Sequence, residues 1–599
     1  MKKASTTALL IFIPLLLLLT LPLGDEVVTA SKIFLASLLT LFLIFGSGIN
    51  LLLKKNAPTR LTSLTLPPLI FIVVITAAIF FTPSRAMTDI LGLGGVYLAM
   101  ILIAWLGKGL ATKKYHHQFL LVWLSSVSLL SIFSTLKLQT PNLMLDYHPT
   151  EAPLVTLQIL GITLVGLIAL TISRHQSKKK TLLNWVTLVI ITIGLGVNIY
   201  SILPGKVFAP ILPSGLASWS IGIDTLRNPQ TAFLGSGPSN YHVAYAKLKP
   251  PWLNQTQLGN VQFTNGANLP LTLLVSTGAL GLGCWLWLTL LILKQVKRHP
   301  QLRTQPLTWM VSSFLVSQLL LPPSTSTLLL FGMTLSAWLS LPAQKFTQRF
   351  QIKHPALIAQ LLGATLVLIS LAGAAGLGVA TFANYKFYQA NQAGQNKQLV
   401  EMYQLQQTAI KLNPYLASYH QRYALTNLSI AMALANKADL TAAEQTQVLQ
   451  LVQQAITEGR VATQLEPHDA NRWRVLGQIY RNLIGIADGA DQWAVTAYTT
   501  AIQTSPSDPS LRVSLGEVLY QTKQLEQAEQ LFLQAIQLKP NLITAHYDLA
   551  NTLVQQNKLE EAVVAYENVL SLLEPTSEDY QAAAAKMQAV QTQIGQQDQ

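Results

Sequence analysis

One polar stretch of the sequence, residues 204–267, holds the residue types that could do chemistry. Its single histidine, His242, can take up or release a proton near neutral pH, and four cations can bind an anionic group. Asp224 is its only carboxylate, so a mechanism that needs two paired acids cannot be built within this stretch. The same residues can also be ordinary solvated charges of a loop. The four cations are Lys206, Arg227, Lys247 and Lys249.

A glycine-rich turn lies in the middle of this stretch. Leu234-Gly235-Ser236-Gly237-Pro238 could cradle a phosphate group through its backbone amides. However, no Lys-Ser/Thr pair follows it, and no strand–helix–strand pattern surrounds it, as a phosphate-binding loop requires. The sequence favours a tight turn after a short amphipathic helix, WSIGIDTLRN, which begins at Trp219.

Long apolar segments flank the polar stretch and must position it. A helix needs about 17 to 25 mostly apolar residues to cross a bilayer, and eleven segments of the chain fit this description. We therefore predict an all-α, polytopic transmembrane bundle of about 11 spans over residues 1–384, with residues 204–267 as its one large loop. The segments lie near residues 6–24, 32–53, 63–82, 88–107, 118–136, 152–173, 181–203, 268–293, 306–322, 325–341 and 356–383.

Lysine and arginine residues indicate the orientation of these segments. With the N-terminus in the cytoplasm, the inner loops hold 19 Lys and Arg residues and no Asp or Glu. The short outer loops hold only three basic residues, Lys32, Arg85 and Lys137, beside the acidic residues Asp25, Glu26, Asp89, Asp146 and Glu151. Such an excess is typical of cytoplasmic loops. Loop 204–267 and everything after Asn384 are then extracytoplasmic, at the inner membrane of a bacterial cell. The first segment is expected to remain as a helix, because no small-x-small cleavage site follows it closely.

The composition is typical of a membrane protein with an appended soluble part. Half of the residues are hydrophobic, 11% are charged and the mean hydropathy is +0.38. Residues 385–599 carry 14 basic and 20 acidic side chains, which leaves 26 of the 40 basic and 6 of the 26 acidic ones to residues 1–384. The basic pI of about 9.6 thus belongs to the membrane part, where it reports topology and not nucleic acid binding.

The predicted spans lack the groups that ion coupling or metal binding would need. Every Asp, Glu, Lys, Arg and His before Tyr385 falls in a loop or at the end of a span, which disfavours an ion-driven transporter. Cys284 is the only cysteine, so no disulfide within the chain and no cysteine-based metal site can form. We expect neither a metal nor a cofactor.

Residues 385–599 show a helical repeat in which each unit ends at a proline. The last three intervals between these prolines are 39, 34 and 35 residues, and the pattern resembles the 34-residue tetratricopeptide repeat, W-x2-L-G-x2-Y with a later Ala and a closing Pro. The 53-residue first interval predicts longer helices. The prolines are Pro414, Pro467, Pro506, Pro540 and Pro575.

The repeat consensus assigns a structural role to the large and small residues of these units. Small residues let paired helices approach closely and large ones fill the gaps, so the aromatic residues Trp473, Tyr480, Tyr498 and Tyr520 are predicted to be repeat core. As a whole, such an array binds a protein partner. The consensus matches are Trp473, Leu476, Gly477, Tyr480 and Ala494; Leu515, Gly516, Leu519, Tyr520 and Ala528; and Leu549, Ala550, Leu553 and Ala562.

The order of pieces in the membrane half resembles the O-antigen ligase and polymerase superfamily of membrane glycosyltransferases. In that family a large outer loop carries a Trp-containing helix, a P-L-x-G-x-G-x-G-x-F turn and a His-Asn pair, and a span with E-x-G-x-x-G follows. Here Trp219 begins the helix, and Gly235 and Gly237 with Tyr241 match the turn. Asn268 matches the Asn of the pair, and residues 276–281, STGALG, match the span motif without its Glu.

The resemblance implies transfer of a polyprenyl-pyrophosphate-linked glycan to an acceptor hydroxyl at the outer face of the membrane, without a metal. It would place His242 near the reacting group as a base. This chain departs from the family at two positions, because Ala267 stands where the histidine would and Gly215 where an arginine would. The implied substrate-binding residues are Arg227, Lys247, Lys249, Lys206, Trp219, Gly235, Gly237, Tyr241 and Asn268.

Two functions therefore remain open from the sequence. The first is an O-antigen ligase-like glycosyltransferase, with the repeats presenting the acceptor. The second is a non-catalytic membrane scaffold on the same fold, whose extracytoplasmic repeats recruit a protein partner. Convergence of His242 and the loop cations on one groove would favour the enzyme, whereas their separation would favour the scaffold.

Overall fold

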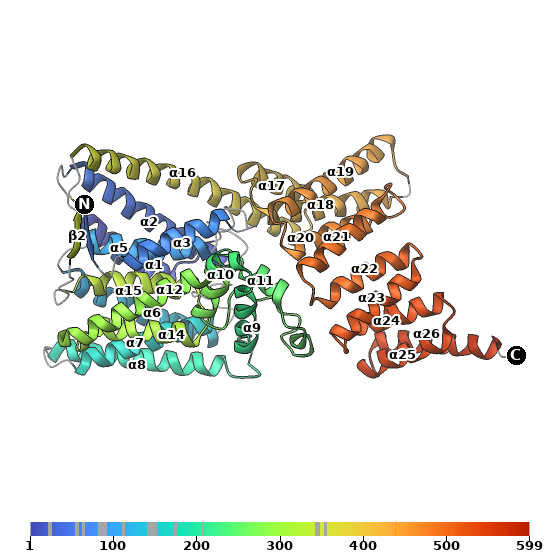
Figure 1. Cartoon of the computed structure of the whole chain (residues 1–599), viewed down its shortest axis with the longest axis horizontal. Coiled ribbons are helices and arrows are strands. Elements are labelled where there is room, and N and C mark those ends of the chain that lie inside the picture. The colour runs from blue at the N-terminus through green and yellow to red at the C-terminus, as the bar shows by residue number, and fades with distance from the viewer. Residues whose placement is uncertain are drawn as a thin grey trace. The chain divides into compact units, whose positions relative to one another are not determined.

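The computed structural model of the chain is helical, with a single short β ribbon in the part of the chain that it describes (Figure 1). In the ribbon, β1 (Thr59–Thr62) pairs antiparallel with β2 (Gln348–Ile352). The all-α prediction is thus confirmed for the architecture, while the ribbon was not predicted. The structure describes residues 2–597 except 22–26, 54–58, 63–65, 82–92, 111–113, 140–151, 173–177, 207, 342–347, 353–355 and 438.

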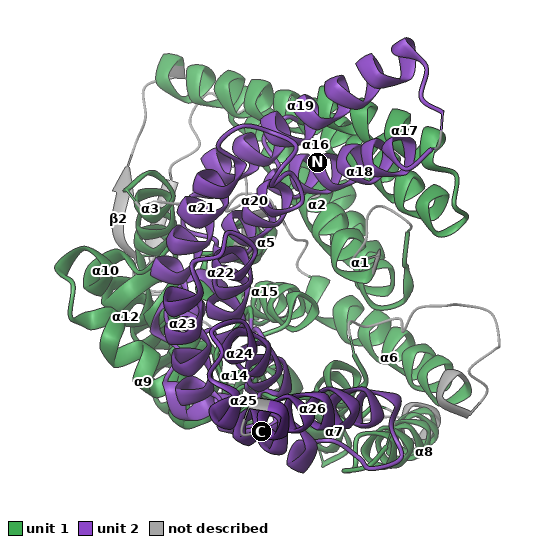
Figure 2. Cartoon of the chain, turned by 90° about the vertical axis from the view of Figure 1, so that its right-hand side faces the viewer, with its two compact units in different colours: residues 1–241, 264–413 green, residues 242–263, 414–599 purple. Residues whose placement is uncertain are grey.

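The chain divides into two compact units (Figure 2). Unit 1 consists of residues 1–241 and 264–413, and unit 2 consists of residues 242–263 and 414–599. Part of the outer loop thus belongs to the same unit as the repeats. The boundary predicted after residue 384 falls inside α16 (Ala356–Gln395), a continuous helix of 40 residues.

Each of the eleven predicted apolar segments contains a helix. Six of these helices are long and apolar enough to cross a membrane, namely α2, α6, α7, α8, α12 and α16, whereas the other five are shorter apolar helices. Length thus supports six spans, and the predicted count of about eleven needs the shorter helices as well. The helices are α1 (Lys2–Leu18), α2 (Val27–Leu53), α3 (Leu66–Phe81), α5 (Leu93–Leu110), α6 (Tyr115–Gln139), α7 (Pro153–Ile172), α8 (Lys178–Ser201), α12 (Leu269–Arg298), α14 (Pro306–Leu320), α15 (Thr325–Leu339) and α16.

Several of the loop charges used for the orientation lie outside the described residues, among them Arg85, Asp25 and Glu26. Lys32, which was assigned to an outer loop, instead lies in the second turn of α2 and is fully buried. Its ammonium donates a hydrogen bond to the carbonyl oxygen of Leu19 at 3.0 Å. The helix begins earlier than predicted because Val27 and Val28 extend the apolar run toward its N-terminus.

Buried indole groups tie the helices of unit 1 together. The N–H of Trp123 on α6 donates to the hydroxyl of Thr163 on α7 at 3.0 Å, and that of Trp338 on α15 donates to Thr308 on α14 at 2.9 Å. A buried indole loses free energy unless its donor finds an acceptor. These bonds therefore select which helices pack side by side in the apolar core.

Unit 2 contains helix pairs that follow the repeat pattern (Figure 2). The first pair, of 19 and 24 residues, is longer than the later ones, as the 53-residue interval predicted. A short helix, α17 (Leu399–Leu412), precedes them in unit 1. The repeat helices are α18 (Ala417–Ala435), α19 (Ala442–Leu465), α20 (Ala470–Arg481), α21 (Ala490–Thr504), α22 (Pro509–Gln521), α23 (Leu525–Leu538), α24 (Ile543–Gln555), α25 (Leu559–Leu572) and α26 (Glu578–Gln597).

Small and large consensus residues interlock in the repeats as predicted. A Cβ on Gly516 of α22 would lie 2.6 Å from the ring of Phe532 on α23, and one on Gly477 of α20 would lie 2.9 Å from the ring of Tyr498 on α21. Tyr480 and Tyr498 are buried, and Trp473 and Tyr520 pack against the same core. The aromatic residues are therefore repeat core, as the sequence predicted.

Candidate functional site

The Trp-containing helix of the outer loop is α9 (Gly215–Leu226). The hydroxyl of Ser214 caps its N-terminus by accepting the amide of Ala217, which explains why the helix begins before Trp219. One face of α9 packs on the rest of unit 1. On the other face, four apolar side chains are exposed, including Trp219 at 56%. These four, which we call the α9 outer face, are Leu216, Trp219, Ile223 and Leu226.

The glycine turn follows a short helix, α10 (Pro229–Leu234), and packs on a kink in α12. Gly235 (φ 74°, ψ −166°) ends α10, and Gly278 (φ 68°, ψ −168°) breaks the helical geometry of α12. A Cβ on Gly235 would lie 2.3 Å from the backbone of Ser276, and one on Gly278 would lie 2.4 Å from the backbone of Phe233. The structure thus brings together the two glycine motifs that the sequence singled out.

The backbone amides of the glycine turn are occupied by protein acceptors. The amide of Gly235 donates to Thr231 at 2.8 Å, that of Ser236 to the Val275 carbonyl at 2.9 Å, and that of Gly237 to the Ser276 carbonyl at 3.1 Å. The last two acceptors are α12 carbonyls close to the Gly278 kink. A phosphate cradle needs these amides free, so the turn packs against a helix, as its sequence favoured.

Two further sequence-selected residues, Tyr241 and Ala267, contact Ser218 of α9, and a third, Asn268, follows directly in the chain. The phenol of Tyr241 donates to the Ser218 hydroxyl at 3.4 Å, and the amide of Ala267 donates to it at 3.0 Å. Burial raises the pKa of Tyr241. The side chain of Asn268 caps α12 by accepting the amide of Leu271 at 3.0 Å. At the position of the family histidine, this chain therefore has a packed backbone junction and no titratable group.

The two loop cations of unit 1 have separate partners. Arg227 is 79% exposed and lies 3.2 Å from the Asp224 carboxylate, one turn earlier in the chain. The ammonium of Lys206 lies 2.8 Å from the phenol oxygen of Tyr200 at the end of α8. Among the described residues, neither Lys206 nor Arg227 makes a hydrogen bond or an ion pair with the glycine turn.

The remaining candidates, His242, Lys247 and Lys249, belong to unit 2. His242 and Lys247 lie on α11 (Tyr241–Leu248), where Lys247 is exposed and His242 is half-buried. His242 makes no side-chain hydrogen bond among the described residues. Lys249 donates to the Gly259 carbonyl, and burial lowers the pKa of its ammonium while Asp508 acts in the opposite direction. Lys249 is thus engaged within unit 2.

Residues 242–263 are bound to the repeats by several hydrogen bonds that the sequence analysis missed. The Ser507 hydroxyl donates to the Lys249 carbonyl at 2.7 Å, and the Asn254 amide group donates to the Ser507 carbonyl at 2.7 Å. Asn254 is 1% exposed, so the acceptor asparagine of the formal glycosylation sequon N-Q-T is buried. No local pattern could have revealed these bonds, because their partners lie more than 250 residues apart.

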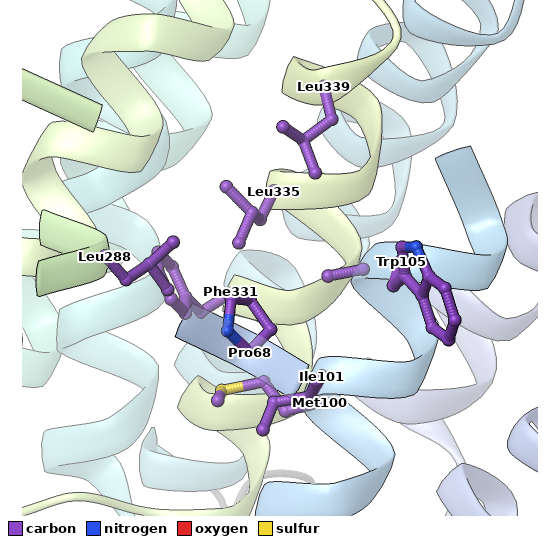
Figure 3. Close-up of a pocket in the computed structure, with 9 residues that line it drawn as sticks. Pro68, Met100, Ile101, Trp105, Leu288, Phe331, Leu335 and Leu339 are labelled. Atoms are coloured by element: carbon purple, nitrogen blue, oxygen red, sulfur yellow. The ribbon is translucent and has the colours of Figure 1, made fainter. Parts of the chain in front are cut away.

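An apolar pocket lies among the helices of unit 1 (Figure 3). Its walls come from α3, α5, α12 and α15, and they include the ring of Trp105 and the side chains of Phe331 and Leu335. None of its lining residues carries a charge or a nucleophile. The pocket therefore has space for an apolar group but no side chain that could take part in a reaction. Among the described residues, there is also no group of three or more potential metal ligands.

Comparison with known proteins matches the repeat region of the chain. The family model described as "Cytochrome c-type biogenesis protein H TPR domain" matches residues 432–580. No curated protein matches the chain. The C-terminal part is therefore a tetratricopeptide repeat domain, a class that commonly binds protein partners.

Three solved structures that are similar to this chain each cover about a third of it. TTC0263, a thermophilic TPR protein of Thermus thermophilus, is 20% identical and covers 35% of this chain and 99% of its own, with a TM-score of 0.26. PilF of Pseudomonas aeruginosa is 15% identical over 35% and 90%, with a TM-score of 0.26. MamA of Desulfovibrio magneticus is 17% identical over 32% and 94%, also at 0.26.

Proposed function

We propose that the protein is a membrane-anchored scaffold whose tetratricopeptide repeats recruit a protein partner at the extracytoplasmic face. The observation that carries this proposal is the separate engagement of the groups that would do chemistry. Arg227 pairs with Asp224, Lys249 is bound within unit 2, and the amides of Ser236 and Gly237 in the glycine turn are bound to α12. A transfer reaction needs a positioned base and fixed positive charge at one place.

The proposed orientation has the N-terminus in the cytoplasm and eleven crossings, which include the five shorter apolar helices. The excess of Lys and Arg in the predicted inner loops supports it. The presence of residues 242–263 and the repeats in one compact unit supports the proposal that the outer loop and the repeats lie on the same side of the membrane. The proposal places that side outside the cell's inner membrane.

The lipid bilayer is the proposed partner of the α9 outer face. Leu216, Trp219 and Ile223 lie on one side of a helix, as in helices that rest in the membrane interface. In α10, the helix after α9, the side chain of Gln230 donates to the carbonyl of Phe81, the last residue of α3, at 2.8 Å. Phe80 and Phe81 are themselves exposed, as lipid-facing residues are.

An O-antigen ligase-like transferase is the second candidate, and one observation favours it. The two glycine motifs on which the resemblance rests, at Gly235 and Gly278, pack against each other. In this alternative the donor is a polyprenyl-pyrophosphate-linked glycan, His242 acts as the base, and Arg227 and Lys247 bind the pyrophosphate. No cofactor or metal takes part.

Complementation of a deletion strain distinguishes the two functions. The double variant His242→Ala/Arg227→Ala is expected to restore the wild-type envelope glycan profile and growth, because neither side chain takes part in a reaction in the scaffold. Lipid-linked glycan would be measured by extraction and mass spectrometry, and membrane levels of the variant by immunoblot. If lipid-linked glycan that has not been transferred accumulated while the variant was present in the membrane at its normal level, the scaffold would be refuted and the transferase supported.

A further inference from the structure

An edge of the repeat array is already covered by the chain itself. The turn between α21 and α22 supplies Ser505 and Ser507, and the turn between α23 and α24 supplies Lys539. These side chains bind the second half of the outer loop. We call Ser505, Ser507 and Lys539 the docking edge, and residues 242–263 the docked segment.

We propose that the docked segment is an intramolecular ligand of the repeats, and that the docking edge holds this half of the outer loop in its folded shape. The inference applies to the scaffold and to the transferase alike, because it concerns how the loop is held and not what the loop does.

The contacts form a continuous row along the docked segment. The Ser505 hydroxyl donates to the Ala246 carbonyl at 3.3 Å, and the Ser507 hydroxyl donates to the Lys249 carbonyl at 2.7 Å. Farther along, the Lys539 ammonium donates to the side-chain oxygen of Asn260 at 2.9 Å. The bonds therefore begin near the end of α11 and reach almost to the end of the segment.

The docked segment has little regular structure that could hold it by itself. After α11 it contains one short 3-10 helix, η1 (Pro251–Gln255), followed by turns. Leu253 and Asn254 of η1 are nevertheless buried, as are Tyr245 and Phe263, whose rings meet edge to face at 5.7 Å. A segment with few bonds of its own opens easily. Its burial depends on the repeats that cover it.

The chemistry of the docking edge fits a neutral, turn-forming segment. Ser505 and Ser507 donate to main-chain carbonyls, and Lys539 donates to an amide oxygen, so no acidic side chain is needed on the segment. In return, the Asn254 amide group donates to the carbonyl of Ser507. A polar group buried in this way costs free energy when its partner is lost. The docking edge and the docked segment therefore match in their hydrogen-bond donors and acceptors.

The docked segment is also anchored at its start. Tyr241, the first residue of α11, is buried in unit 1 against Ser218, while the chain just after α11 is bound to Ser507. A partner that displaced the segment from the docking edge would free the loop on the repeat side of α11. The binding of a partner to the repeats is then coupled to the conformation of the outer loop.

Proteolysis of the full-length protein in nanodiscs tests the proposal. Lys-C cuts after the exposed Lys247, and cleavage requires local opening of the segment. The variant Asn254→Ala/Ser507→Ala removes two hydrogen bonds and is expected to be cut about tenfold faster or more. Ser510→Ala, at an exposed serine of the next helix, is the matched control and should be cut at the wild-type rate. A wild-type cleavage rate in the double variant would overturn the proposal.

Cross-linking provides a second measurement that does not depend on a destabilised variant. In a Cys284→Ala background, Asn260→Cys/Lys539→Cys is expected to be joined by a short bismaleimide in membranes, so that the two fragments produced by cleavage after the exposed Lys437, which lies between the two positions, stay together on a denaturing gel. The control pair Asn260→Cys/Lys586→Cys places the second thiol on α26 and should remain unjoined. Equal cross-linking of the two pairs, or none in the first, would contradict a docked segment.

Discussion

Replacement of Gly235 by alanine is expected to destabilise the folded outer loop by at least about 3 kcal/mol. The backbone angles of Gly235 lie in a region that is almost restricted to glycine, where another residue costs about 1–3 kcal/mol. In addition, the new Cβ would lie 2.3 Å from the carbonyl carbon of Ser276. Because the atoms that meet at this contact are backbone atoms, the clash cannot be relieved by the rotation of a side chain. The contact between α10 and the kink of α12 must therefore separate.

Thermal unfolding of the purified full-length protein in detergent measures this effect. Gly278→Ala should behave like Gly235→Ala, because each glycine approaches the backbone beside the other. Gly215→Ala is the matched control: it lies at the start of α9 with open space around its Cβ position. Equal melting temperatures for Gly235→Ala and Gly215→Ala would show that the glycine turn does not pack on the α12 kink.

Replacement of Asp548 by asparagine is expected to stabilise unit 2 strongly at pH 8 and to stabilise it much less at pH 5. Burial, and next the nearby Glu517, raise the pKa of Asp548 to about 7, while Lys586 and Arg481 act in the opposite direction. In the unfolded chain the pKa is about 3.9. The folded state therefore binds the proton more tightly, and wild-type stability falls as the pH rises from about 4 through 7.

The pKa difference of about three units corresponds to about 4 kcal/mol at pH 8, which solvent screening of the partly exposed carboxylate reduces to about 2 kcal/mol, or roughly 5 °C in the melting temperature of the repeats. Circular dichroism of the full-length protein at pH 5 and pH 8 measures it, with Asp488→Asn at an exposed aspartate as the control. If Asp548→Asn changed the melting temperature equally at both pH values, a cause other than the carboxylate charge would be responsible, and the pH dependence assigned to this residue would be wrong.

The elements that depend on local sequence patterns were predicted well. Apolar length predicted helices at all eleven segments, and the spacing of consensus residues such as Gly477 and Gly516 predicted the packing of the repeats. Both patterns follow from contacts between residues that are close in the sequence. The start of α2 and the burial of Lys32 were missed, because one additional helical turn moves a charged residue from a loop into a packed helix.

The candidate site was predicted only in part, because its contacts join distant residues. The motif at Gly235 and the motif at Gly278 were both recognised, but their direct contact was not expected from either. Asn268 was predicted to bind substrate and in the structure caps α12. Lys249 was chosen for its charge alone, whereas its burial depends on unit 2. Composition identifies candidate groups, but tertiary contacts decide which of them are free.

The central claim is that the outer loop and the repeats lie outside the cytoplasm after eleven crossings. If only the six longer helices crossed, the chain would return to the side on which it begins. Alkaline phosphatase, active only outside the cytoplasm, and green fluorescent protein, fluorescent only inside it, fused separately after Gln599 measure this directly. The account predicts phosphatase activity without fluorescence; a fluorescent fusion with an inactive phosphatase would contradict it.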